Sequence, residues 1–371
     1  MGINQYPTRY VSDVDVVISG TAPSTPDVGD IWVDTSSEVV PVDILETKIA
    51  GRNLLQNGAM QIHQRGTTTG STTSSGYPAD RWSFVNSSVG TWTGTVENDA
   101  PTGTGFRKSV KIYCDAADAS PAASEYLQFR QTIEGQNLQS IKKGTANAEQ
   151  LTLSFWVKGN KTGTYIVELF DTDNSRCVSK AYTINTSATW EQNVVTFPAD
   201  TTGAFDNDNA GSLVVTFWLA SGSDYSSGSP LNTSWNNASG LTTRVNGGTN
   251  LASATTQYIQ FTGIQLETGP SATHYEHKDY GTELSECQRY YETGTVDNAN
   301  YGLAGNYAST WVQFAATKRG TTTVSQTNAL ATNCSSTPAN SPYTNGFMTY
   351  RTVTATGAFQ FRETWAATAD L

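Results

Sequence analysis

The chain has 371 residues, a formal net charge of −11 and only 15% charged side chains, so its polar surface is mostly Ser, Thr, Asn, Gln and Gly. It contains no basic cluster that could follow a phosphate backbone or an anionic bilayer, so we expect neither nucleic-acid binding nor membrane insertion. No apolar run approaches the roughly 18 residues of a membrane span, and the N-terminus lacks the apolar core of a signal peptide. Scarce charge disfavours long helices and favours many short strands, with 11% aromatic residues to fill a core.

Residues 1–50 contain few large apolar side chains, and a segment this thin cannot bury a core of its own. Two strand candidates, Val14–Ile18 and Ile31–Val33, favour an arm that docks on another surface over a disordered tail, because unpaired apolar strands are a liability in water. We therefore predict an extended N-terminal arm that attaches the chain to another surface. The residues assigned to this attachment are Tyr6, Tyr10, Ile31 and Trp32.

Strand patterns follow one another through the middle of the chain and predict an all-β fold, with a jelly-roll β-sandwich over residues 51–278. The clearest strands are Ser109–Cys114, Tyr126–Ile133, Leu151–Val157, Tyr165–Phe170, Val178–Ile184, Glu191–Phe197, Leu213–Leu219 and Tyr258–Leu266. In the last strand the apolar positions change phase at Gly263, and a β-bulge there would return both sets of apolar side chains to the core.

A Ser/Gly/Asn-rich loop over residues 220–256 is long enough to be functional. Flat aromatic faces stack on pyranose rings, and carboxylate and amide groups fix sugar hydroxyls through directional hydrogen bonds. The loop contains both kinds of group. The candidate carbohydrate-binding residues are Tyr225, Trp235, Asp224, Asn236 and Asn237. The alternative for Trp235 is a side chain folded back to cover the edge of the sandwich.

Residues 279–371 are predicted to form one short helix and a smaller C-terminal β domain. The helix candidate, Asp279–Glu292, has Asp279 or Thr282 as its cap and Gly294 after its end. Its narrow apolar stripe suits a three-fold axis, and the domain carries more aromatic side chains than one small core needs. We therefore predict a homotrimer, the competing account being that these aromatics pack within the same chain. The interface residues assigned are Leu284, Cys287 and Tyr291.

Motifs for catalysis are missing from the sequence, which has no nucleophile elbow, Walker loop or paired-histidine zinc motif. We therefore predict that the protein is not an enzyme. The three histidines suit structural roles, because no further ligands accompany them. The loop around Asp206 and Asp208 offers carboxylate oxygens, with a plain polar turn as the default. We expect no cofactor and no metal, calcium at these two residues being the alternative.

Two stretches resemble the opening and closing motifs of phage tail-fibre and virion appendage proteins. NLLQNGAMQIHQRG and YPADRW lie within residues 53–82, and GIQLETGPSATHYEHK and ELSECQRYYE lie within residues 263–292. The arm motif PSTPDVGDIWVDT is similar to segments near the N-termini of phage fibres. From the residues themselves, we expect Arg81 to pair with Asp80 or Glu267 and so to tie the first strand to the last.

The resemblance implies a jelly roll similar to carbohydrate-binding modules, joined to a small β domain. It also implies a homotrimer on a virion, assembled in the host cytoplasm, whose residues 1–50 bind other phage tail or capsid proteins. The function that follows is a bacteriophage tail-fibre or receptor-binding component that contacts host surface polysaccharide. The alternative is a purely structural capsid decoration or tail connector without a ligand of its own.

Overall fold

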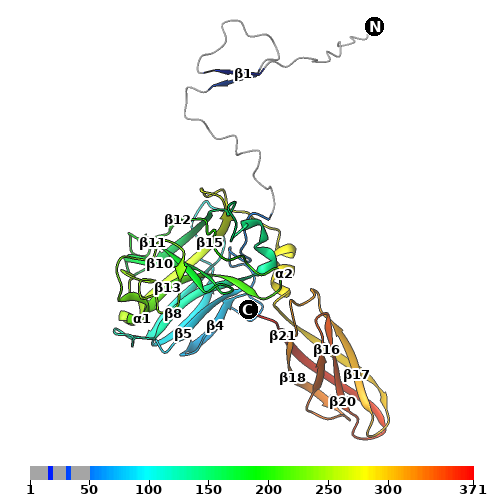
Figure 1. Cartoon of the computed structure of the whole chain (residues 1–371). Helices are drawn as coiled ribbons and strands as arrows, with labels where there is room; N and C mark the ends of the chain where they lie inside the picture. Colours follow the sequence, from blue (N-terminus) through cyan, green and yellow to red (C-terminus); the bar gives the residue numbers. More distant parts are fainter. Residues whose placement is uncertain (1–15, 20–30, 35–50) are drawn as a thin grey trace, which may run out of the picture. The chain divides into compact units, whose positions relative to one another are not determined.

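The computed structural model describes residues 16–19, 31–34 and 51–371 of the chain (Figure 1). Nearly all of its regular structure is β, as the sequence predicts. The chain divides into two compact units at Ala50. Among the described residues, no helix is both long and apolar enough to cross a bilayer.

In the first unit, β1 (Val16–Ser19) and β2 (Ile31–Asp34) pair in parallel. Ile31 and Trp32 belong to β2, whereas Tyr6 and Tyr10 lie outside the described residues. The attachment role of this unit stays a prediction.

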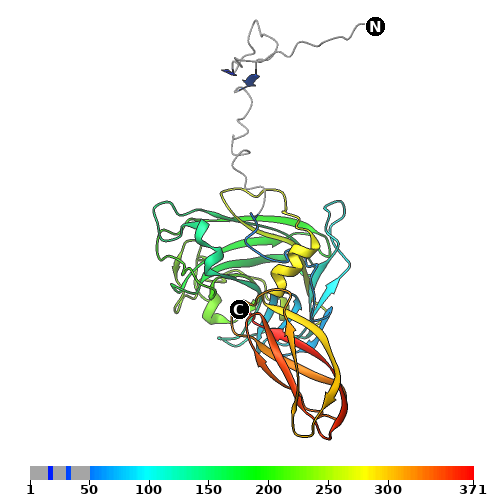
Figure 2. The same ribbon diagram turned by 90° about the vertical axis from the view of Figure 1, so that its right-hand side faces the viewer.

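A β-sandwich of two antiparallel sheets makes up most of the second unit (Figures 1 and 2). One sheet has seven strands in the order β14-β11-β10-β13-β8-β5-β4, and the other has six in the order β12-β9-β15-β7-β6-β3. The strands of the first are β4 (Gly76–Ala79), β5 (Trp82–Ser87), β8 (Tyr126–Glu134), β10 (Gly163–Asp171), β11 (Arg176–Ile184), β13 (Gly211–Ser221) and β14 (Asn236–Asn237). Those of the second are β3 (Thr68–Thr72), β6 (Thr91–Glu97), β7 (Ser109–Ala116), β9 (Leu151–Gly159), β12 (Glu191–Phe197) and β15 (Tyr258–Thr268).

All the sandwich strands named from the sequence are present, each with the predicted bounds or slightly longer ones. The sequence patterns missed β3, β4, β5 and β6 because these strands are short or polar. Four short helical turns lie in the connections: η2 (Gly135–Asn137), η3 (Gln139–Ile141), α1 (Ser223–Ser226) and η4 (Leu251–Ser253).

Aromatic rings fill the space between the two sheets. Phe261 of β15 lies at their centre, 4.6 Å from the ring of Phe217 and stacked on Phe129 at 5.3 Å. Trp82 stacks on the other side of Phe129 at 5.0 Å. All four side chains are at least 99% buried, so the inward faces of β5, β8, β13 and β15 meet in one continuous core.

The bulge predicted in β15 is present at Gly263. Its φ of +61° lies in the left-handed region, and a Cβ there would come within 2.5 Å of the Phe106 ring. The pairing of β15 with β9 shifts register across this position. As predicted, the shift returns Ile264 and Leu266 to the core beyond the bulge.

The opening motif supplies the hydrogen bonds that the bulge removes from the ladder. The Asn53 carboxamide donates to the carbonyl of Ile264 at 3.1 Å and accepts from the N–H of Leu266 at 3.0 Å. The backbone N–H of Asn53 in turn donates to Glu276 at 2.8 Å. The two motifs that resemble phage proteins therefore bind each other directly, 211 residues apart.

Arg81 does not form the ion pair expected from the sequence. Its guanidinium donates to the side chain of Gln56 and the carbonyl of Thr132 and lies 3.4 Å from the centre of the Tyr290 ring. The expectation was wrong because Gln56, Thr132 and Tyr290 engage the guanidinium instead. The backbone of Arg81 has a φ of +70°, in the left-handed region.

The smaller β domain contains two three-stranded antiparallel sheets. One is β16 (Tyr291–Gly302), β21 (Gly357–Thr368) and β18 (Thr323–Thr332), and the other is β17 (Tyr307–Gln313), β20 (Gly346–Thr352) and β19 (Ala339–Pro342). Two small apolar clusters form its core. The carboxylate of Glu363 accepts from Arg351 at 2.8 Å, and both side chains are completely buried.

The helix α2 (Tyr280–Gln288) is shorter than predicted, although Asp279 caps it by accepting from the N–H of Thr282 at 3.0 Å. Just beyond the helix, Glu134 accepts two hydrogen bonds from Arg289, at 2.8 Å each, and one from the Tyr290 hydroxyl. Burial would raise the pKa of Glu134, but these bonds outweigh it and hold the pKa below its ordinary value.

The predicted apolar stripe for a trimer is not on an exposed helix face. Cys287 is completely buried within the chain, and Leu284 is half-buried. Tyr291 begins β16, and the guanidinium of Arg65 lies 3.6 Å from its ring centre. Six aromatic residues of the range 279–371 are core residues of this chain, as in the competing account: Tyr290, Phe314, Phe347, Phe359, Phe361 and Trp365.

We expect Phe261→Ala to lower the free energy of unfolding by about 3–5 kcal/mol, since it opens a cavity among rings that cannot collapse. Denaturant or thermal unfolding measures the effect. Val194→Ala is the control, because Val194 is 51% exposed on β12 and its loss should change stability by less than about 0.5 kcal/mol. Equal stability of the two variants would contradict this account of the core.

Candidate functional site

The long loop between β13 and η4 lies on the outer face of the seven-stranded sheet. Val245 of this loop packs with Ile166 of β10 and Trp218 of β13, and Tyr126 and Tyr225 pack around them. The Tyr126 ring lies 5.6 Å from the Tyr225 ring, edge to face. The loop is therefore held by its own small apolar cluster on a surface that strands alone would leave open.

Strand register arranges the outer face in cross-strand rows. Glu168 of β10 is opposite Thr216 of β13, which is opposite Arg130 of β8. In the next row, Trp218 lies opposite Gln128. Side chains at these positions share one face because successive residues of a strand point to opposite sides. The face thus alternates aromatic and hydrogen-bonding groups over three adjacent strands.

A buried ion pair joins the loop to this face. Arg244 donates to both carboxylate oxygens of Glu168, at 2.8 and 2.6 Å. Its guanidinium also lies 5.4 Å from the Trp218 ring and 5.7 Å from the Tyr225 ring. Burial would lower the pKa of Arg244, but the bonds and charge of Glu168 outweigh it and raise that pKa. Burial raises the pKa of Glu168, and the bonds and charge of Arg244 oppose that rise. The two-point contact between the guanidinium and the carboxylate fixes the loop in place.

Two adjoining hollows lie on the outer face, and together we call them the groove. The first, of about 180 Å³, is lined by Tyr126, Gln128, Trp218 and Tyr225, among others. The second, of about 410 Å³, continues toward Arg319 and the chain end at Leu371. Both hollows share the side chains of Arg130, Phe170 and Val214.

Arg130 is the cation at the boundary of the two hollows. Its one side-chain bond is a long one of 3.4 Å to Gln128, and no ion pair engages it among residues 51–371. A planar guanidinium presents directed donors to hydroxyl or carboxylate oxygens. The groove therefore offers aromatic faces, an amide and a guanidinium within one concave surface.

The structure separates the residues predicted to bind sugar. Tyr225 lines the groove, and Asp224 is exposed beside it in α1. Asn236 and Asn237 instead form β14 at the edge of the sheet, beyond β11 and β10. Trp235 precedes them, and its ring packs against the sandwich core while its indole N–H donates to Pro198 at 2.8 Å. Trp235 therefore has the covering position given as the alternative.

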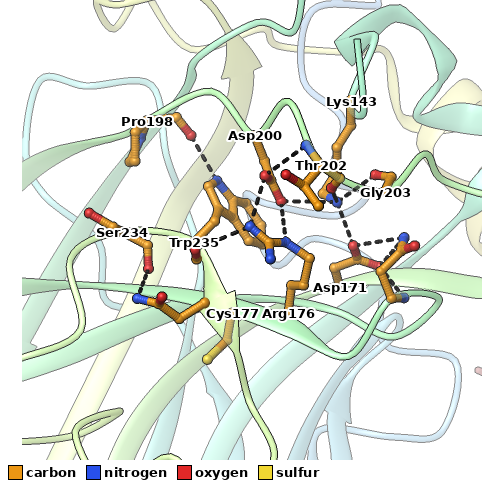
Figure 3. Close-up of polar contacts among 12 residues, drawn as sticks. Lys143, Asp171, Arg176, Cys177, Pro198, Asp200, Thr202, Gly203, Ser234 and Trp235 are labelled. Carbon is orange, nitrogen blue, oxygen red and sulfur yellow. Dashed lines mark hydrogen bonds and ion pairs between the residues drawn. The ribbon is translucent and has the colours of Figure 1, made fainter.

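Beside Trp235, Lys143 lies in a cage of oxygens (Figure 3). Its ammonium is 2.6 Å from Asp171 and 3.1 Å from Asp200, and donates to the carbonyls of Thr202 and Gly203 at 2.9 and 2.7 Å. Its side chain is 2% exposed. A lysine thus supplies the positive charge in an oxygen-rich pocket of the kind that attracts hard cations.

Arg176 completes this cluster. It donates to Asp200 at 2.8 and 3.0 Å and to the carbonyl of Trp235 at 3.1 Å (Figure 3). Burial would raise the pKa of Asp200, but the bonds from Arg176 and Lys143 outweigh it and lower that pKa. The cluster holds Trp235 and β14 against the sandwich and is a structural element.

The two calcium candidates take part in turns. The backbone N–H of Asp206 donates to Asp173 at 2.9 Å, and Asp208 accepts from the N–H of Ala210 at 2.9 Å. Over the ranges that the structure describes, no group of three or more His, Cys, Asp and Glu side chains is placed to hold a metal ion.

Of the three histidines, His277 has its ring packed on Phe106 and Tyr275.

Sequence reasoning missed most of the groove, although it identified the strands that carry it. The outward phases of β8 and β13 read Tyr126-Gln128-Arg130 and Val214-Thr216-Trp218. A sandwich face exposed to water should be polar. Aromatic residues in the outward phase of two adjacent strands could therefore have indicated a covered or ligand-binding face.

Comparisons with known proteins give distant structural similarities alone. No family model matches the chain, and no curated protein matches it significantly. Its structure is similar to the enzymatically active domain of tailspike protein 4 of bacteriophage CBA120, at 16% identity and a TM-score of 0.30, over 58% of this chain and 21% of that one. The chain therefore spans about a fifth of the tailspike's length.

Carbohydrate-binding modules are also among the similar structures. TmCBM61, solved with β-1,4-galactotriose, is 12% identical with a TM-score of 0.28, over 58% of this chain and 99% of that one. The CBM22-1 xylan-binding domain of Paenibacillus barcinonensis Xyn10C is 10% identical with a TM-score of 0.27, over 60% and 98%. At this distance the similarities carry no argument about ligands.

We expect Lys143→Met to lower the free energy of unfolding by about 3–5 kcal/mol, because it leaves Asp171 and Asp200 with less neutralisation in a buried site. Lys142→Met is the matched control. Lys142 pairs with Glu149 at 2.7 Å but is 53% exposed, so its loss should cost no more than about 1 kcal/mol. Chemical unfolding of both variants compares them, and similar losses would contradict the structural role of the cage.

Proposed function

We propose that the protein binds a glycan in the groove on the outer face of the seven-stranded sheet. The observation that carries this proposal is the combination, in one concave surface, of aromatic rings with an amide and a guanidinium that are joined by a single long hydrogen bond of 3.4 Å. Tyr126, Tyr225 and Phe170 offer ring faces, and Gln128 and Arg130 offer directed donors. Pyranose rings have apolar faces and hydroxyl edges, so they match such a surface.

We further propose binding without hydrolysis. Glycosidases use two carboxyl groups that flank the scissile bond, separated by roughly 5–10 Å. In the first hollow the carboxylate is Glu168, which Arg244 binds at both oxygens. In the second it is Asp370, which pairs with Arg65. Both are occupied by arginines, which argues for a binding module.

The proposed setting is a phage virion, with the chain as a tail-fibre or receptor-binding component. The resemblance of the opening and closing motifs to phage appendage proteins supports it. Residues 1–50 would then attach the chain to other tail or capsid proteins. The structural alternative, a decoration or connector without a ligand, predicts a groove that binds no glycan.

We also propose a homotrimer formed through the smaller β domain. The support is the distribution of exposed apolar side chains, since most of the large ones lie after residue 279. Those assigned to the interface are Trp311, Leu330 and Tyr343. Exposed aromatic surface of this extent is typical of interfaces.

The groove is tested by the double variant Tyr126→Ala, Tyr225→Ala and, separately, by Arg130→Ala. Affinity electrophoresis in gels with β-1,4-galactan, xylan, mixed-linked β-1,3-1,4-glucan or polygalacturonate measures binding. We expect at least one polysaccharide to retard the unaltered protein, and both variants to bind it roughly tenfold more weakly, from lost stacking and lost directed hydrogen bonds. Tyr280→Ala is the control, because Tyr280 is 59% exposed on α2.

Two results would count against the groove. Unchanged affinity of the groove variants would place the binding elsewhere on the chain. Unchanged mobility of the unaltered protein in every gel would favour the purely structural alternative.

The trimer is tested by light scattering on the full chain at micromolar concentration. We expect a mass three times that of the 39.9 kDa chain, and dissociation when Trp311→Ala and Leu330→Ala remove exposed apolar contacts. A monomeric mass for the unaltered chain would leave the trimer without support.

A further inference from the structure

Apart from the exposed Asp297–Arg362 pair, the smaller β domain presents a surface almost without charge. Between Asn298 and Phe361 the sequence has three charged residues, Lys318, Arg319 and Arg351. The side chains of Lys318 and Arg351 are completely buried in ion pairs. Arg319 donates to backbone carbonyls of Asn209, Ala369 and Asp370 at the junction with the sandwich. The remaining exposed side chains in this range are hydroxyl, amide, aliphatic or aromatic.

The turn between β16 and β17 lies at the end of this domain (Figure 1). A hollow of about 350 Å³ lies beside this turn. We call it the tip hollow. Tyr301 and Tyr307 border it and are 66% and 70% exposed. Asn300, Asn306 and Ser309 also line it. This combination of Tyr, Asn, Ser and Gly is the one that antibody paratopes use for adaptable hydrogen bonding and stacking.

Backbone hydrogen bonds fix the shape of the tip hollow. The β16–β17 turn closes with the N–H of Asn306 donating to Leu303 at 3.0 Å. Gly305 donates to Val353 at 2.9 Å, and Val353 donates back to Asn306 at 2.8 Å. The adjoining β20–β21 connection is held by the Asn333 carboxamide, which donates to Ala355 at 2.7 Å. The site is therefore preorganised, which lowers the entropy cost of binding.

We propose that the tip hollow is a second binding site, for a neutral sugar segment, distinct from the groove. Its size falls within the range of about 300–1,000 Å³ that small-ligand sites occupy. The two tyrosine rings offer stacking faces, and the asparagines and Ser309 offer paired donors and acceptors to hydroxyls. The hollow has no charged lining residue, so an anionic sugar would lose hydration there without gaining a partner.

The proposal does not depend on the groove, and the experiment separates the two. The full chain is compared as four proteins: unaltered, groove variant (Tyr126→Ala, Tyr225→Ala), tip variant (Tyr301→Ala, Tyr307→Ala), and both combined. Saturation-transfer NMR is measured with neutral hexasaccharides of glucose, galactose, xylose and mannose, and with anionic oligogalacturonate. Both tip tyrosines are largely exposed, so their loss should not affect folding, and Tyr280→Ala again serves as the control.

In the groove variant only the tip hollow remains. We expect this variant to give a signal with at least one neutral hexasaccharide and no signal with oligogalacturonate. The combined variant should lose that neutral signal, with affinity reduced roughly tenfold or more. Retention of the signal in the combined variant, or its absence in the groove variant, overturns the tip site. The two proposals can fail separately. If the groove variant binds as the unaltered protein does while the tip variant loses the signal, the groove proposal fails and the tip site stands.

Discussion

The carboxamide of Asn53 joins the opening segment of the chain to the last strand of the sandwich. Gly263 interrupts β15 with a bulge, which frees the carbonyl of Ile264 and the N–H of Leu266 from the ladder in a fully buried strand. Buried backbone groups without partners are costly, and Asn53 supplies both a donor and an acceptor to them. An Asp or a Leu at this position could supply at most one of the two bonds, so the requirement is specific to a carboxamide.

This contact also explains why distant parts of the chain work as one unit. Asn53 binds Glu276 through its backbone, and Asn57 binds Glu283 of α2 in the same way. The closing motif then continues into Arg289 and Tyr290, which meet Glu134 at the end of β8. The opening segment, the last strand of the sandwich and the start of the smaller β domain are thus linked by a sequence of polar contacts between buried and half-buried groups.

The sequence predicted the features that local patterns encode. The phase change at Gly263 gave the bulge, and period-two alternation gave the strands. It could not predict the contact between Arg289, at the end of α2, and Glu134, because the two are 155 residues apart. The groove could not be predicted for the same reason. Its covering loop is held by the hydrogen bonds from Arg244 to Glu168, which lies 76 residues away in the sequence. The residues near Trp235 in the sequence are of the types found in sugar-binding sites. In the structure, however, the cluster of Lys143 and Arg176 holds Trp235 against the sandwich.

Charge placement connects the fold to the two proposed sites. The chain has 22 basic residues against 33 acidic ones, and several of the basic ones are held in buried pairs such as Arg244–Glu168 and Arg351–Glu363. Pairing of this kind removes charge from the surfaces that surround the groove and the tip hollow. What remains exposed there is Arg130 in the groove and uncharged amides and tyrosines at the tip. Surfaces of that kind discriminate by the geometry of hydroxyl groups, because long-range charge contributes little to binding at them.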